Sequence, residues 1–86
     1  METRAYGPVT EAQVTQLLQD VKSNGLTVTP TTAQSGVVTG YGTELSYHYN
    51  AAKRSLQLSL VKHPPFLSGA VWRRVEQRIP LSVSRL

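Results

Sequence analysis

Two runs of strictly alternating residues constrain the fold of this chain more than any other feature. Residues 44–49 read Glu-Leu-Ser-Tyr-His-Tyr, and residues 55–60 read Ser-Leu-Gln-Leu-Ser-Leu. Successive side chains of a strand point to opposite faces, so each run has one apolar side and one polar side. Paired as antiparallel neighbours, the two strands form a sheet with one face for a core and one face for water. The pattern indicates an architecture and no particular chemistry.

A helix is predicted on each side of these strands in the sequence. Thr10 and Gln13 form the pattern of a capping box at the start of the first helix, and Gly25 supplies the left-handed residue that ends it. The second helix is predicted from Ser68 to about Ile79, ahead of a proline. Each helix has an apolar stripe, which is typical of a helix that packs on a sheet.

Two turns set the predicted register of the sheet. Residues 42–43, Gly-Thr, suit a type II′ turn and place Val38 opposite Tyr47. A four-residue loop over residues 51–54 places Tyr47 opposite Leu58, so that the apolar side chains of neighbouring strands share one face.

Further strands are predicted at residues 26–29 and 36–41. The expected fold is therefore an α+β two-layer sandwich, in which a three- to four-stranded antiparallel meander carries both helices on one face, in the order α-β-β-β-β-α. A chain of 86 residues is the size of one domain, spanning residues 1–86. Residues 1–8 and 80–86 are expected to be loosely ordered tails, although the second tail alternates weakly and could instead add a strand.

Composition argues against several kinds of chemistry. No cysteine is present, which excludes disulfides, thiolate catalysis and cysteine-based zinc sites. The two histidines have no partner at metal-ligand spacing, and no carboxylates have the spacing of an acid–base pair. We therefore expect no metal, no cofactor and no enzyme activity.

No apolar run approaches a membrane span and the first residues lack the apolar segment of a signal peptide, so we expect a cytoplasmic protein.

Charge is divided unevenly along the chain. The net charge is +4, but residues 1–50 sum to −2 and residues 51–86 sum to +6. A basic half can bind nucleic acid or another acidic partner, and it can equally serve only solubility. The residues that would bind an anion or nucleic acid are Lys53, Arg54, Lys62, Arg73, Arg74 and Arg78. The order of elements is similar to that of double-stranded-RNA-binding domains, but this chain lacks the Gly-Pro-x-His loop and the Lys-Lys-x-Ala-Lys run of that family.

The polar face of the sheet is the other candidate surface. The predicted register places Val37, His48 and Gln57 side by side there, with Tyr41 further along the same face. Such faces are usually only solvated, yet this set can also form a dimer or ligand surface. We therefore expect a small non-catalytic module that binds a protein partner or itself. The alternative is a basic nucleic-acid-binding domain.

Overall fold

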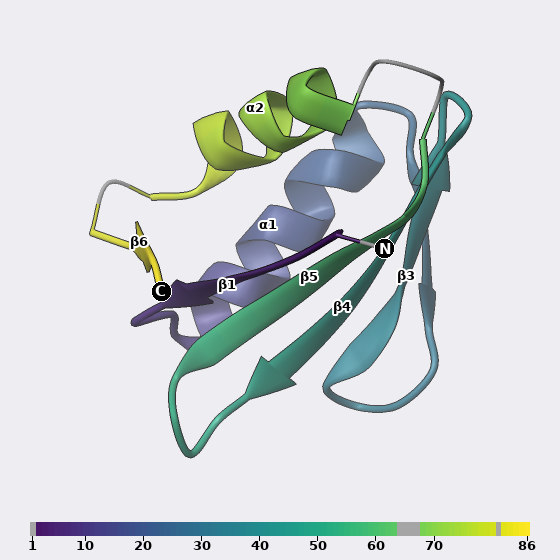
Figure 1. The fold of residues 1–86 in the computed structure, drawn as a ribbon. Coiled ribbons are helices and arrows are strands. Elements are labelled where there is room, and N and C mark those ends of the chain that lie inside the picture. The colour runs from purple at the N-terminus through teal and green to yellow at the C-terminus, as the bar shows by residue number, and fades with distance from the viewer. Residues whose placement is uncertain (1, 64–67, 81) are drawn as a thin grey trace.

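The computed structural model describes residues 2–63, 68–80 and 82–86, and within them two helices pack on one side of a six-stranded antiparallel sheet (Figure 1). The elements in chain order are β1 (Glu2–Gly7), α1 (Glu11–Ser23), β2 (Thr27–Pro30), β3 (Ser35–Gly40), β4 (Thr43–Asn50), β5 (Ser55–Lys62), α2 (Ser68–Arg78) and β6 (Ser84–Arg85). The prediction of a small α+β domain with an antiparallel sheet and two helices is confirmed. The residues of the predicted C-terminal tail that the structure describes are 80 and 82–86.

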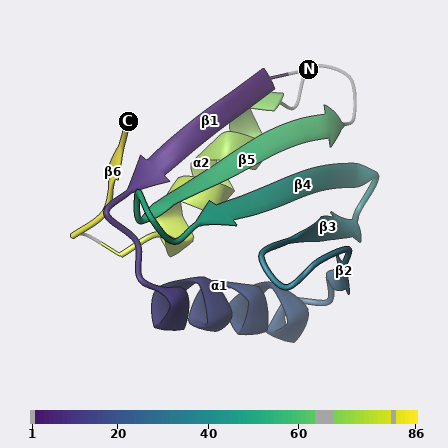
Figure 2. The same ribbon diagram turned by 90° about the horizontal axis from the view of Figure 1, so that it is seen from below.

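The strand count and strand order differ from the prediction. The spatial order is β2-β3-β4-β5-β1-β6, so the sheet has six strands instead of three or four (Figure 2). Strands β2 to β5 form the expected meander. The segment predicted as a loose N-terminal tail is β1, which pairs with β5 along Glu2 to Tyr6, and part of the C-terminal tail is β6, which pairs with β1.

The register of the β4–β5 hairpin is confirmed, and that of the β3–β4 hairpin is shifted. Across the four-residue loop Tyr47 pairs with Leu58, as predicted. In β3–β4, Val38 pairs with Leu45 instead of Tyr47, because the turn is made by Tyr41 and the glycine after it. Both turn residues have positive φ, 53° and 73°, as in a type I′ turn. The shift is two residues, so every side chain keeps its predicted face.

Helix α1 has the predicted start and end. The Thr10 side chain accepts a hydrogen bond from the Gln13 amide, and the Gln13 side chain accepts one from the Thr10 amide. At the other end Gly25 has φ +88°, and the amide of Leu26 donates to the carbonyl of Val21. These are the bonds of a capping box and a Schellman motif, which satisfy backbone groups that the helix itself cannot.

The hydrophobic core lies between the sheet and the two helices. Val14 of α1 and Trp72 of α2 both belong to the same buried cluster as the inward side chains of the strands. Trp72 and Leu60 are the largest side chains that are fully buried, with exposed fractions of 1% and 2%. Because both described helices contribute to this one cluster, neither of them lies on the opposite face of the sheet (Figure 2).

Candidate interaction surface

The open face is the side of the sheet that points away from the helices (Figure 2). Two adjacent rows of paired residues cross it, and we define the open face by them. The rows are Thr29–Val37–Ser46–Ser59–Thr3 and Ser35–His48–Gln57–Ala5. No residue in either row is an acid, a lysine or an arginine. The next row contains the charged pair Glu44 and Lys62, which marks one end of this uncharged surface.

Three of the four residues predicted for an interaction face lie on the open face. Val37, His48 and Gln57 are all there, and His48 pairs directly with Gln57. On its other side His48 pairs with Ser35 instead of Val37, which follows from the two-residue shift of the β3–β4 register. The Ser35 hydroxyl lies 2.6 Å from Nδ1 of His48, a hydrogen bond that orients the imidazole ring.

Tyr41, the fourth predicted residue, is not on the open face. It lies in the β3–β4 turn, where 77% of its surface is exposed. Its hydroxyl donates a 3.0 Å hydrogen bond to the carbonyl of Asn24, the last residue of the α1 cap. Tyr41 therefore links the β3–β4 turn to the helix layer. It is not on the open face because it is a turn residue and not a strand residue.

The six basic residues predicted to bind an anion do not form one patch. Lys53 and Arg54 lie in the β4–β5 loop, whereas Lys62 is the last residue of β5. Lys62 is the eighth residue after that loop along β5, a separation of about 25 Å at the usual rise per residue. The remaining three arginines are on α2, and there the Arg78 side chain donates a 3.1 Å hydrogen bond to Oδ1 of Asn24.

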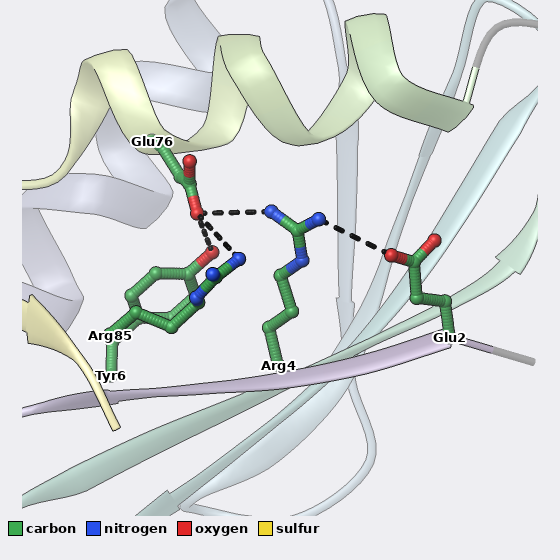
Figure 3. A network of polar contacts seen from close by, with 5 residues as sticks. All are labelled: Glu2, Arg4, Tyr6, Glu76 and Arg85. Atoms are coloured by element: carbon green, nitrogen blue, oxygen red, sulfur yellow. Dashed lines mark hydrogen bonds and ion pairs between the residues drawn. The ribbon is translucent and has the colours of Figure 1, made fainter.

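A cluster of charged side chains joins β1, α2 and β6 (Figure 3). One carboxylate oxygen of Glu76 accepts hydrogen bonds from the Tyr6 hydroxyl at 2.9 Å and from the Arg4 guanidinium at 3.1 Å. Arg85 lies 3.9 Å from the same oxygen, and the other terminal nitrogen of Arg4 lies 3.3 Å from Glu2. The sequence alone does not predict this cluster, because the cluster depends on β1, a segment whose sequence predicts a loose tail.

The cluster shifts the pKa values of Arg4, Tyr6 and Glu76, and that of Arg4 is raised. Burial, followed by the neighbouring carboxylate, raises the pKa of Tyr6 to about 12. The hydrogen bond from Tyr6, followed by the contact with Arg4, holds the pKa of Glu76 below its ordinary range. Both changes are unfavourable for acid–base catalysis near neutral pH, because Tyr6 becomes a weaker acid and Glu76 a weaker base.

A groove of about 400 Å³ lies between β1 and α2, beside this cluster. Its lining residues are Arg4, Gly69, Trp72, Arg73, Glu76 and Gln77. The Arg4 guanidinium lies 4.8 Å from the centroid of the Trp72 ring, a cation–π contact, and it is bonded to Glu76 as well. A ligand would have to displace these contacts to reach Arg4, so we interpret the groove as a packing seam held by charged side chains.

Neither a metal site nor a membrane-spanning helix is found in the part of the chain that the structure describes. Those residues contain no group of three or more His, Asp or Glu side chains that could hold a metal ion. Neither described helix is long and apolar enough to cross a membrane. Comparisons with protein-family models, with curated proteins and with solved structures found no match to this chain.

Proposed function

We propose that this chain is a small non-catalytic interaction module, acting in the cytoplasm, that binds a protein through the open face of its sheet. The observation that carries the proposal is the lack of charge on that face. Two rows, one crossing five strands and the other four, hold only hydroxyl, amide, imidazole and small apolar side chains, in a chain of net charge +4. The centres of protein–protein interfaces are depleted of charged residues, and this surface shares that property.

A non-catalytic role is supported by the state of the titratable cluster around Glu76. Its carboxylate already accepts hydrogen bonds from Tyr6 and Arg4. Catalytic groups need free hydrogen-bonding capacity toward a substrate and a pKa near the working pH. The shifted pKa values of Tyr6 and Glu76 both depart from that condition, which favours a structural role for the contacts.

Nucleic-acid binding is a second candidate, and one observation favours it. Arg73 and Arg74 on α2 are exposed and form no ion pair with any residue in the described ranges. Two adjacent free guanidinium groups are suited to phosphate oxygens. However, the separation of the other basic residues leaves a small footprint, and this is why we favour a protein partner.

Cysteine labelling can test whether the open face is covered by a partner. Because the chain has no cysteine, a single introduced thiol reports on one position. Gln57→Cys places a thiol on the open face, and Gln19→Cys places one on the exposed side of α1 as a matched control. The rate of maleimide labelling should be measured for both variants in cell extract and in dilute purified protein.

If a partner covers the open face, maleimide should label Gln57→Cys more slowly in extract than in dilute solution. The labelling rate of Gln19→Cys should be the same in both conditions. Circular dichroism of both variants checks that each one folds. Equal rates for Gln57→Cys in the two conditions would show that nothing covers the open face, and the proposed function would then be wrong.

A further inference from the structure

We propose that the outer edge of β1, over residues 2–5, binds an extended peptide segment of another protein that carries an acidic residue opposite Arg4. The segment adds to the sheet as a strand, antiparallel to β1 and in line with β6. This site is at the edge of the sheet and is separate from the open face. The free backbone groups of the edge, the strand that already occupies one end of it and the charge beside it all support the proposal.

The outer edge of β1 has backbone groups that no described strand pairs with. Strand β6 pairs only with Tyr6 and Gly7, so it lies beside one end of β1 (Figure 2). The amide of Leu86 donates a 2.8 Å hydrogen bond to the carbonyl of Ala5, so the backbone of Ala5 points to this edge. Alternate residues of a strand point their backbone groups to the same edge, so those of Thr3 also point outward. Among the described residues none forms a backbone hydrogen bond with Thr3 on this side, so its amide and carbonyl are available to a further strand.

Strand β6 shows what kind of segment this edge accepts. Arg85 pairs with Tyr6, and its guanidinium lies 3.9 Å from the carboxylate of Glu76 on α2. The side chain of a residue opposite Tyr6 therefore points toward the helix layer. In a strand that runs in the same direction as β6, the next side chain on that side lies opposite Arg4. Leu86, of which 74% is exposed, would move aside for such a strand.

A free arginine lies close to the position opposite Arg4. Arg73 lines the groove between β1 and α2 together with Arg4, and it forms no ion pair with a described residue. Arg73 is three residues before Glu76, so both side chains lie on the side of α2 that reaches β6. Glu2 and Glu76 are already paired with Arg4. An acidic side chain from a peptide therefore gains an ion pair with Arg73 and leaves the contacts of Arg4 in place.

The charges on β1 also select against other strands. Glu2 and Arg4 both lie on the helix side of this edge, and an apolar strand beside them would remove water from these charges without replacing it. The other edge of the sheet, β2, is four residues long and ends at Pro30, which has no amide hydrogen to donate. The edge of β1 is therefore the better site for strand addition.

Titration of the isotope-labelled protein with a synthetic peptide, followed by NMR, provides the test. The probe is a short peptide of threonine and valine with one central aspartate and blocked ends, and its counterpart has lysine in place of the aspartate. The aspartate peptide should shift the amide resonances of Thr3 and Ala5 and slow hydrogen exchange at Thr3, while the amide of Gln57 on the open face stays unchanged. It should bind about fivefold more tightly than the lysine peptide, because it gains an exposed ion pair and avoids a contact between like charges.

Two pairs of variants separate the role of the backbone from that of charge. Thr3→Pro removes the outward amide and no hydrogen bond to β5, so it should abolish binding, whereas Thr3→Ala keeps the amide and should still bind. Both changes remove the hydroxyl that is bonded to Ser59, so they are matched. Arg73→Glu should reverse the preference in favour of the lysine peptide. Arg74→Glu, on another side of α2, should leave the preference for aspartate unchanged.

Circular dichroism checks that each variant folds, and Arg73→Glu tests the site even where Thr3→Pro does not fold. The proposal is overturned if about millimolar aspartate peptide shifts neither Thr3 nor Ala5, or if folded Thr3→Pro binds as well as the wild type. Equal affinities for the aspartate and lysine peptides would also overturn it, as would an unchanged preference in Arg73→Glu.

Discussion

Truncating Leu60 should cost this protein a large part of its stability. Leu60 lies at the middle of the sheet, paired with Leu45 on β4 and Glu2 on β1, and its exposed fraction is 2%. Leu60→Ala removes three carbon atoms from the core, which is about 2.4 kcal/mol of transfer free energy at about 0.8 kcal/mol per methylene. The cavity left behind adds to this, so the expected loss is about 2–5 kcal/mol. Domains of this length have free energies of unfolding of about 4–13 kcal/mol.

Urea unfolding followed by the fluorescence of Trp72, the only tryptophan, measures this loss. The neighbouring residue Val61 provides the control, because it is 42% exposed and Val61→Ala should change the free energy of unfolding by no more than about 0.5 kcal/mol. Both variants should be measured at the same low protein concentration. A loss for Leu60→Ala equal to that of the control would refute the placement of Leu60 in the core.

Three further predictions concern the surface contacts. Because the pKa of Glu76 is depressed in the fold, its contribution to stability is present at neutral pH and is lost as the pH falls through that lowered pKa; Glu76→Gln should flatten this part of the pH dependence of the urea midpoint. Tyr41→Phe removes the hydrogen bond to the carbonyl of Asn24 and should cost about 0.5–1 kcal/mol in the same assay, with no change indicating that water replaces the bond. If nucleic acid binds α2, Arg73→Ala combined with Arg74→Ala should lower the salt dependence of binding by about two phosphate contacts in fluorescence anisotropy, and an unchanged slope would show that these arginines bind no phosphate.

The parts of the fold that the sequence predicts are those in which local pattern and turn chemistry agree. In the β4–β5 hairpin, the alternating leucines and the length of the loop both favour the pairing of Tyr47 with Leu58, and that register is confirmed. In β3–β4 the alternation fixes only which face each residue occupies. It does not distinguish registers that differ by two residues, and the choice then depends on whether Tyr41 accepts a positive φ. Tyrosine rarely adopts that conformation, so the sequence favoured the other turn.

Strand β1 could not be predicted, because its hydrophobic pattern does not resemble that of a half-buried strand. The side chains that point toward the helix layer are those of Glu2, Arg4 and Tyr6, and two of these three are charged. Their charges are paired with one another and with Glu76, a residue that is 70 positions away from Tyr6 in the sequence. No local pattern contains that information. For the same reason the sequence predicts only part of the open face. Thr3 joins its row only when β1 is paired with β5.

Over residues 2–5 the two sides of β1 have the reverse of the usual polarity, and this determines the composition of the open face there. A half-buried strand normally points charged side chains toward water and apolar side chains toward the helix layer. In β1 the helix side carries Arg4 and Glu2, whereas the open side carries Thr3 and Ala5. Glu76 compensates the charge of Arg4 on the helix side. Charged residues on the open side would be better hydrated than Thr3 and Ala5 are. Contact with water therefore does not explain why these positions are uncharged. Small uncharged residues there continue the uncharged rows of the open face, and β1 extends that surface to a fifth strand.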